Sequence, residues 1–358
     1  MSAPVAVPAQ TEEQRELVAV LDAFVAERVR PRLADIAAAD RVPDDLHARL
    51  GSQGLWSLGM PEEVGGGGGD LPTLVLALQR LATGSAALAL TVAHAHAVVA
   101  VLADHAEGRS AAAEVAAGAR PALVDLVRAP VTATAQDDGP VLDGAVPRVD
   151  AGDARLHLLL EPPGVPGGVA LADPTVPGFV AGPVARRCGL AGATTRAIEF
   201  DGCHLARLAP FPATAAAASR GRIVLLLGAA AAAAGIAEAA ATAAGGYLAE
   251  RHQFGGPLAE RPVLRRRLVA LRGHVQAALD SVWARGTRTA GLAALPADEA
   301  DTLAGECAAV AGRCTSTAVA VGADAVQLHG GYGYLEEYAV ERLMRDAVSL
   351  RAAAAAIT

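Results

Sequence analysis

The hydrophobic pattern of the chain changes its period twice, and this order of patterns limits the fold more than any other feature. Over residues 12–117 the apolar positions recur at helical spacing, whereas over residues 121–212 short runs alternate apolar with polar residues among prolines and glycines. Helical spacing returns from residue 219 onward. The sequence therefore predicts an α+β fold that is mostly α. Its expected parts are an N-terminal helical domain (1–118), a middle antiparallel β domain (119–215) and a C-terminal four-helix bundle (216–358).

Starts and stops of helices can be placed in the two helical zones. Pro31 ends the first helix or restarts the next one, and the glycine-rich loop 65–69 precedes a helix that begins near Pro72. Residues 86–102 are strongly apolar and predict a buried helix that carries His94 and His96. In the last zone, four long helices with short links are expected at about 219–250, 261–290, 298–323 and 337–350.

The sequence pattern of the middle zone is typical of short strands. Strands are expected at 131–135, 156–160, 168–172 and 197–200. The pairs Asp138-Gly139 and Asp143-Gly144 are turn signals. No helix-length periodic segment interrupts them, so this zone predicts a small antiparallel β domain.

Charge and composition exclude several classes of function. All 30 basic residues are arginine, which excludes a Schiff-base lysine and the lysine of a phosphate-binding P-loop. The formal net charge is -8 and no basic stripe is present, so nucleic acid is not expected as a partner. Aromatic residues make up only 3% of the chain, and its many alanines favour closely packed helices.

The cysteines and the apolar runs predict a cytoplasmic protein without a metal site. The four cysteines form no CxxC pair, and Cys307 and Cys314 are expected to pack in the core. Residues 1–16 lack the basic and apolar regions of a signal peptide. The longest apolar run, residues 223–237, is shorter than the ~20 residues of a membrane span, so we expect a bundle helix and no membrane association.

Several motifs, in the same order as the zones, resemble those of the acyl-CoA dehydrogenase family. The resemblance covers about residues 12–347. The first zone contains GLWSLGMPEEVGG at 54–66, and the middle zone contains VLDGA at 141–145, GLAG at 189–192 and IEF at 198–200. The bundle contains RHQFGGP at 251–257 and QLHGGYGYLEEYAVERLMRD at 327–346, which are the most specific of these matches. The resemblance implies an acyl-CoA dehydrogenase-like fold and a dimer or tetramer, either homo- or hetero-oligomeric.

The resemblance also implies FAD as the cofactor. In this family the two bundle motifs hold the ADP half of FAD, whose flavin ring lies in the neighbouring subunit. Arginine offers a planar donor fork to a pyrophosphate, and glycines allow the backbone to approach a phosphate or sugar closely. The cofactor-binding residues that follow from the resemblance are Arg251, Phe254, Gln327, Gly330 and Gly331.

The half of the flavin site that faces the ring departs from the family pattern. The family's Thr-Glu-Pro…Gly-Ser loop reads ALVDLVRAP at 122–130, and its Trp-Ile-Thr strand reads VPRV at 146–149. The reaction abstracts the α-proton of an acyl thioester while the β-hydride passes to flavin N5, and it requires a desolvated carboxylate as base. The family's glutamate position reads Ala354 here, and the alternative position in some relatives falls near Leu225. The catalytic base therefore stays unassigned.

Other polar residues are considered as substitutes for the missing glutamate. Glu238 lies thirteen residues beyond Leu225, or ~20 Å along a helix, and is expected to be paired or to face solvent at the polar edge of the helix. His94 and His96 stand two apart, so they point in different directions on a helix, and one or both are candidates for contact with the acyl substrate.

Three functions are compatible with these residues. The chain is a flavin-dependent dehydrogenase of acyl-CoA or acyl-carrier-protein thioesters with an unrecognised base, alone or within a complex. Alternatively, it is the non-catalytic partner subunit of a hetero-oligomeric acyl-CoA dehydrogenase and lends its ADP-binding motifs to a flavin in an active subunit. The third reading is a flavin monooxygenase-like offshoot, whose chemistry needs no α-proton base.

Overall fold

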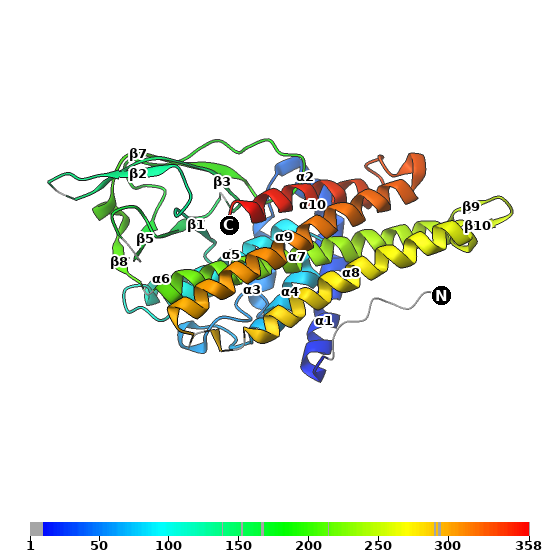
Figure 1. Cartoon of the computed structure of the whole chain (residues 1–358), viewed down its shortest axis with the longest axis horizontal. Coiled ribbons are helices and arrows are strands. Elements are labelled where there is room, and N and C mark those ends of the chain that lie inside the picture. The colour runs from blue at the N-terminus through cyan, green and yellow to red at the C-terminus, as the bar shows by residue number, and fades with distance from the viewer. Residues whose placement is uncertain are drawn as a thin grey trace.

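The computed structural model describes residues 10–357 except 138, 152, 166–167, 214, 290 and 293–294. Helices, then strands, then helices follow one another along the chain, as the periodicities predict (Figure 1). The β domain lies beside one end of a long helical body, and the helices of the first zone pack against the C-terminal bundle. The predicted fold class is thereby confirmed. Asp138 of one predicted turn, and most of the N-terminal segment used for the signal-peptide prediction, lie outside the described residues.

Side-chain caps set the starts of the N-terminal helices. Thr11 and Gln14 form a reciprocal capping box at α1, while the side chains of Asp70 and Ser85 cap α4 and α5. Pro31 lies in a short 3-10 turn between helices, as expected from its missing N–H. The helices of this zone are α1 (Glu12–Phe24), α2 (Leu33–Ala39), α3 (Asp44–Ser52), α4 (Leu71–Ala82), α5 (Ala86–Leu102) and α6 (Arg109–Ala116).

The β domain consists of two four-stranded sheets, in the orders β1-β4-β5-β8 and β2-β3-β7-β6. Its apolar core lies between the sheets, and Leu158 and Leu160 of β4 face the helices instead. Six of the strands pair only in the antiparallel sense, whereas β1 and β4 pair in parallel with each other. The strands are β1 (Pro121–Asp125), β2 (Val131–Thr134), β3 (Val141–Val149), β4 (Leu156–Leu160), β5 (Gly168–Ala172), β6 (Phe179–Ala181), β7 (Arg196–His204) and β8 (Pro210–Pro212).

The turn predicted at Asp143-Gly144 is wrong. Both residues lie inside β3, where the register with β7 shifts between Leu142 and Gly144. Gly144 has a φ of 128°, and a Cβ there would lie 2.1 Å from the carbonyl oxygen of Pro130. An Asp-Gly pair therefore marks a bulge here, because glycine serves the positive φ of a bulge as well as that of a turn.

Helix α7 (Ala215–Glu250) is the centre of the molecule. It packs against α4 and α5 on one side and against α8 (Pro262–Arg288), α9 (Ala297–Leu328) and α10 (Ala339–Ala355) on the other. Small residues make these contacts close: a Cβ on Gly228 would lie 2.5 Å from the Ala93 Cβ of α5. By length and hydropathy α7 resembles a membrane span, but 89% of its most apolar stretch is buried, as in the core helix of a bundle.

The thiols in the bundle are core residues, as predicted. Burial raises the pKa of both Cys307 and Cys314 to about 12, so both are protonated thiols packed on α9. Among the described residues no group of His, Cys, Asp and Glu side chains is arranged to hold a metal ion.

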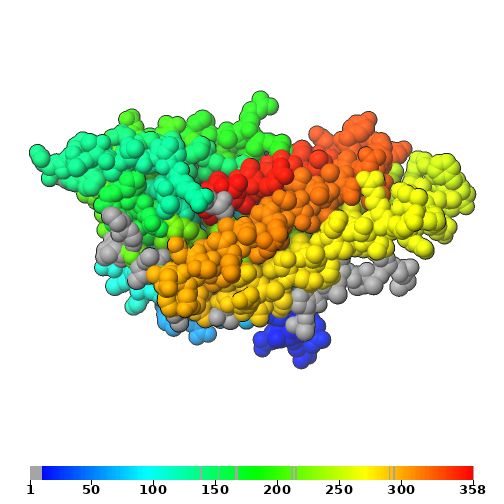
Figure 2. Space-filling model, in the orientation of Figure 1, coloured from blue at the N-terminus to red at the C-terminus, as the bar shows by residue number. Residues whose placement is uncertain are grey.

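Helix α10 joins the bundle to the β domain. The carboxylate of Asp346 accepts a hydrogen bond from the backbone N–H of Leu190 at 2.7 Å, and the Ser349 hydroxyl accepts one from Gly189 at 3.0 Å. Gly189 lies so close to α10 that a Cβ would be 2.2 Å from the Arg345 carbonyl group. The space-filling view shows α10 (red) lying between the β domain (green) and α9 (orange) (Figure 2).

Candidate functional site

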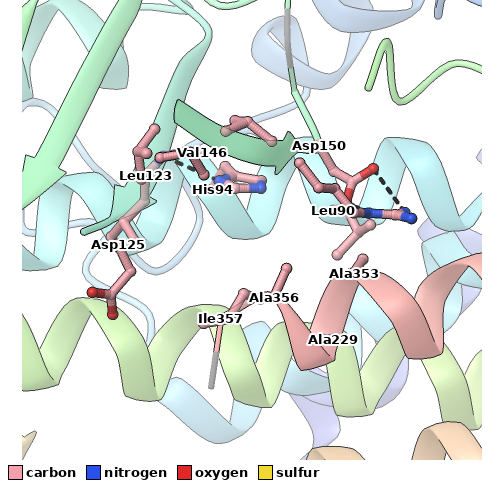
Figure 3. A pocket seen from close by; sticks show the side chains of 13 residues that line it. Leu90, His94, Leu123, Asp125, Val146, Asp150, Ala229, Ala353, Ala356 and Ile357 are labelled. Carbon is pink, nitrogen blue, oxygen red and sulfur yellow. Dashed lines mark hydrogen bonds and ion pairs between the residues drawn. The ribbon is translucent and has the colours of Figure 1, made fainter. Parts of the chain in front are cut away.

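A pocket lies where the β domain meets α5, α7 and the end of α10 (Figure 3). Most of its wall is apolar, and its polar side chains are His94, Asp125, Arg148 and Asp150. Its cavity volume is about 30 Å³, and the surrounding non-atom space, which includes space open to solvent, is about 500 Å³. We call it the inner pocket, and its remaining lining residues are Leu90, Leu123, Val124, Val146, Val149, Ala229, Ala353, Ala356 and Ile357.

A wider groove adjoins the inner pocket. The two share Asp125, Val146, Arg148, Ala356 and Ile357, and the groove encloses about 1660 Å³, including space open to solvent. Its walls come from β1 and β3, from α7 and α9, and from the residues that follow β1. We call it the outer groove. Together the two form a cleft that narrows from a charged entrance to a mostly apolar interior with a few polar side chains, as many small-molecule sites do.

The first charged cluster in the cleft is centred on Arg222 of α7. Its guanidinium Nη2 lies 3.1 Å from Oδ1 of Asp125 and 2.8 Å from Oε1 of Glu161. Asp125 is only 12% exposed, and it also accepts a hydrogen bond from the backbone N–H of Val127 at 3.0 Å. The carboxylate of Asp125 is thus held by an arginine and a backbone donor.

The second cluster is centred on Arg148 of β3. This arginine donates to both carboxylate oxygens of Asp150, at 2.7 and 3.0 Å, and to the carbonyl oxygen of Ser349 on α10 at 3.0 Å. Asp150 is 6% exposed at its side chain and also accepts a hydrogen bond from the Thr195 hydroxyl. This cluster ties the β domain to the end of α10, beside the inner pocket.

His94 lies at the inner pocket, and its ring is oriented by the backbone of β1. The backbone N–H of Leu123 donates to His94 Nδ1 at 3.2 Å. Burial lowers the pKa of His94 to about 4, so the imidazole is neutral at physiological pH. His94 is therefore the one of the two candidate histidines that lies on the cleft.

His96 is a structural residue of the N-terminal domain. Its Nδ1 donates to the carbonyl oxygen of Val92 at 2.9 Å, and its Nε2 accepts from the backbone N–H of Gly59 at 3.1 Å. It thereby anchors the segment that leads into the glycine-rich loop. Burial lowers the pKa of His96 to about 4 as well, and the residue is absent from the lining of the cleft.

Neither position that the resemblance implies for the base carries a polar side chain in the cleft. Ala354 and Leu225 are both buried, and their neighbours Ala353 and Leu226, rather than they, line the cleft. Glu238 is ion-paired as expected, with Arg80 Nη1 2.9 Å from its Oε1, and it also accepts a hydrogen bond from Gln79.

The three glutamates of the long C-terminal motif also lie elsewhere. Glu341 is paired with Arg345 on α10, and Glu336 and Glu337 are exposed.

The two predicted nucleotide-binding motifs lie together at the far end of the bundle. The guanidinium carbon of Arg251 is 5.3 Å from the centroid of the Tyr332 ring, which directly follows Gly330 and Gly331. Gln327 and both glycines are exposed. The Tyr247 ring stacks on His329 at 4.4 Å between centroids and so links α7 to the second motif.

Phe254 projects from the tip of a small hairpin formed by β9 (His252–Gln253) and β10 (Gly256–Pro257). It is 83% exposed and has a φ of 55°. Arg261 holds this tip, since it donates to the carbonyl oxygens of Gln253 and Phe254, and its guanidinium carbon lies 5.9 Å from the Phe254 ring. An aromatic side chain held outward in this way is available to a ligand or to another subunit.

The cleft and the two predicted nucleotide-binding motifs are far apart within one chain. They lie toward opposite ends of α7, with β9 and β10 at one end of the bundle and β3 near the other (Figure 1). At 1.5 Å per residue, the helix from Arg222 to Glu250 is roughly 40 Å long. One dinucleotide does not bridge this distance, so the two regions cannot serve the same FAD molecule within one subunit.

Four cleft residues were not identified from the sequence as site residues: Asp125, Arg148, Asp150 and Arg222. For Asp125 and Arg148 the only sequence signal was a charge in segments that resemble ring-facing segments of relatives, at 122–130 and 146–149, and Asp150 and Arg222 lie outside these segments. The pairing partners are far apart in sequence, since Arg222 and Asp125 are separated by 97 positions.

Comparison with known proteins gives a consistent family assignment. The family model for the acyl-CoA dehydrogenase N-terminal domain matches residues 11–109, and the model for the C-terminal domain of the same family matches residues 215–354. An acyl-CoA dehydrogenase from Bacillus subtilis is 28% identical, over 94% of this chain and 93% of that protein.

Solved structures agree at the level of the fold. Butyryl-CoA dehydrogenase from Megasphaera elsdenii has a TM-score of 0.83 and 23% identity, covering 98% of each chain. A glutaryl-CoA dehydrogenase from Mycobacterium smegmatis, in complex with FADH2, has a TM-score of 0.83 and 17% identity, covering 95% of this chain and 90% of that one. At such identities the likeness concerns the fold alone.

Proposed function

Because the chain belongs to the acyl-CoA dehydrogenase family, we propose that it takes part in the α,β-dehydrogenation of an acyl thioester as a subunit that binds FAD but does not abstract the proton. In this role it acts within a hetero-oligomer, and a homologue that retains the glutamate supplies the base. The proposal rests on one observation: the two buried carboxylates of the cleft, Asp150 and Asp125, are both ion-paired with arginines.

A general base must present a free oxygen lone pair to the substrate, in a setting that favours its protonation during the reaction. Asp150 receives two hydrogen bonds from Arg148 and one from Thr195, and Asp125 is paired with Arg222. These hydrogen bonds engage the carboxylate oxygens that a base would present to the substrate. Loss of a general base costs a factor of roughly 10² to 10⁴ in rate.

FAD, when bound, supplies the hydride acceptor of the reaction. The residues of this chain suit the ADP half of the cofactor: Arg251 is a positively charged donor at the bundle tip, Gln327 is exposed, and Gly330 and Gly331 have no side chain that blocks a phosphate. The separation of this tip from the cleft supports binding of FAD across a subunit boundary. The segments 122–130 and 146–149, where the resemblance implies hydroxyl groups and a tryptophan, instead place Asp125 and Arg148 in the cleft, which does not fit the flavin ring.

A dehydrogenase that is active alone is the second candidate. Asp125 supports it, since this carboxylate lines both the inner pocket and the outer groove. Under this reading Asp125→Asn abolishes reduction of an electron-accepting dye by the isolated chain with an acyl-CoA. Under the partner reading the isolated chain shows no such activity before or after the substitution.

The test of the proposal is the flavin spectrum of the full-length chain alone and after mixing with a homologue that carries the family's glutamate. We expect the isolated chain to be colourless or weakly coloured. The mixture should form a defined hetero-oligomer, bind FAD and reduce the dye with an acyl-CoA. An isolated chain that is fully flavin-loaded and active contradicts the partner role.

Arg251→Ala should weaken FAD binding by the mixed oligomer about 10- to 100-fold. A hydrogen bond to a charged group contributes about 1.5–3 kcal/mol, and each 1.4 kcal/mol corresponds to a factor of ten in affinity. Flavin fluorescence titration measures this change. Arg28→Ala, at an exposed arginine near the end of α1, is the matched control and should leave FAD affinity unchanged. Equal FAD affinity of the two variants would remove Arg251 from the cofactor site.

A further inference from the structure

The hydrogen bond between β1 and α5 decides which nitrogen of His94 carries the proton. The backbone N–H of Leu123 can only donate, so His94 Nδ1 must be an unprotonated acceptor. Burial keeps the ring neutral, and a neutral imidazole has one N–H. The proton of His94 is therefore on Nε2.

The Nε2–H of His94 lies at the lining of the inner pocket and has no protein acceptor among the described residues. The close-up shows the ring between Leu123, which contacts its Nδ1 side, and the space bounded by Leu90, Ala229 and Ala353 (Figure 3). These neighbours are apolar. A donor that faces a pocket and meets no protein acceptor there is open to an occupant that brings an oxygen atom.

The two carboxylates of the inner pocket do not accept a hydrogen bond from His94 Nε2, because each is bound by other donors. Asp150 is bound by Arg148 and Thr195, and Asp125 by Arg222 and the Val127 backbone. The apolar wall disfavours a charged occupant, since burying an unpaired charge is far more costly than burying a neutral carbonyl group. The cleft is wide and charged outside and narrow and mostly apolar inside, which fits a molecule with a polar carrier and an acyl end.

We propose that His94 is a ligand-binding residue whose Nε2–H donates a hydrogen bond to a carbonyl oxygen of an acyl thioester held in this chain's own cleft. The inference rests on the proposed role in acyl thioester chemistry, and it adds a binding site that does not depend on a base. The carbonyl is that of the thioester or a second one along the acyl chain. The imidazole acts as a donor and not as a proton acceptor.

The experiment is titration calorimetry of the full-length chain with three ligands: CoA, butyryl-CoA and acetoacetyl-CoA. His94→Asn is the informative variant, because an asparagine oxygen at the place of Nδ1 keeps the acceptor for Leu123 while the donor at Nε2 is lost. His94→Gln is the complementary variant, because its side-chain amide group extends to the position of Nε2. We expect wild type to bind an acyl ligand more tightly than CoA. His94→Asn should weaken that binding about 5- to 20-fold, His94→Gln should restore part of it, and CoA binding should not change.

Comparison of the two acyl ligands distinguishes the thioester carbonyl from a second carbonyl along the acyl chain. Weaker binding of both acyl ligands by His94→Asn assigns the thioester carbonyl, whereas a loss confined to acetoacetyl-CoA assigns the carbonyl along the chain. Equal affinity of wild type and His94→Asn for both acyl ligands overturns the proposal, as does wild-type binding that is no tighter for either acyl ligand than for CoA.

A second measurement on wild type does not depend on the folding of a variant. Nitrogen-15 NMR of labelled histidine should show His94 protonated at Nε2 near neutral pH, with a shift of that resonance when an acyl ligand is added. Protonation at Nδ1 overturns the inference. The partner role is tested separately by flavin loading and hetero-oligomer formation, so failure of one does not imply failure of the other.

Discussion

Lowering the pH from 7.5 to 4.5 should remove most of the folding stability of this chain. Burial lowers the pKa of four histidines to about 4, below the ordinary value of 6.5 that they regain on unfolding. Between pH 6.5 and about pH 4, these histidines are protonated in the unfolded chain but remain neutral in the folded chain. The free energy of unfolding therefore decreases as the pH falls through this window. The four residues are His47, His94, His96 and His157.

The expected loss is large compared with the stability of a typical domain. One pKa unit corresponds to about 1.4 kcal/mol, so each histidine contributes roughly 3 kcal/mol over the whole window. Four such contributions are on the order of 10 kcal/mol, while domains are typically stable by about 5–15 kcal/mol. Guanidinium unfolding followed by circular dichroism at a series of pH values measures the loss. A free energy of unfolding that stays level between pH 7.5 and 4.5 contradicts it.

His157→Leu isolates one of the four histidines. His157 is completely buried in the β domain, packs edge-on against Phe179 at 5.0 Å between centroids, and has no hydrogen-bond partner for either ring nitrogen among the described residues. Replacing a buried polar group that lacks partners with an apolar one should preserve or raise stability at pH 7.5. It should also reduce the acid-induced loss by roughly 3 kcal/mol. His252→Gln, at an exposed histidine, is the control and should leave the pH dependence unchanged.

Asp346→Ala should destabilise the chain by about 3–5 kcal/mol, the usual cost of removing one partner of a buried ion pair. Asp346 is 9% exposed at its side chain, accepts a hydrogen bond from Arg342 at 3.0 Å, and also accepts the Leu190 N–H across the domain boundary. Burial raises the pKa of this carboxyl group, and the charge of Arg342 opposes that rise. The substitution leaves both donors without their acceptor and loosens the attachment of α10 to the β domain.

Asp324→Ala is the control for this prediction. Asp324 pairs with Arg267 on the bundle surface, and both side chains are 42% exposed. Exposed pairs contribute about 0–1 kcal/mol, so the control should change the free energy of unfolding by less than about 1 kcal/mol. Urea or guanidinium unfolding of the two variants compares them directly. Similar losses in both variants refute a special role of Asp346 at the domain boundary.

The predicted effect of Asp346→Ala extends to the cleft. Ala353 near the end of α10, and Ala356 and Ile357 just after it, form one wall of the inner pocket. The hydrogen bonds from Arg148 to Ser349 and from Gly189 to Ser349 hold the same part of the helix. The wall of the pocket therefore depends on contacts between the β domain and the bundle, and both parts are needed to shape it.

The sequence by itself determined the local features of the protein. The spacing of apolar residues predicted the helix at 86–102 and the strands at 156–160 and 168–172, and the structure has these bounds. Such elements follow from the periodicity of apolar side chains over neighbouring residues, and this periodicity can be read from the sequence alone. The motifs at 251–257 and 327–346 identified the family for the same reason, and the alanine at the position of the family's glutamate, Ala354, is likewise a property of the sequence alone.

Only the tertiary structure determined which polar groups contact one another and which atoms of them carry a proton. The parallel pairing of β1 with β4 and the bulge at Gly144 depend on partners that local pattern does not specify. Arg148 reaches Ser349 across 201 residues, and Leu123 sets the proton of His94 across 29. The physical reason is that hydrogen bonds and ion pairs depend on distance in space and on exclusion of water. The sequence predicted that the family glutamate is missing, and the tertiary structure determined that arginines bind the two buried carboxylates of the cleft, Asp125 and Asp150.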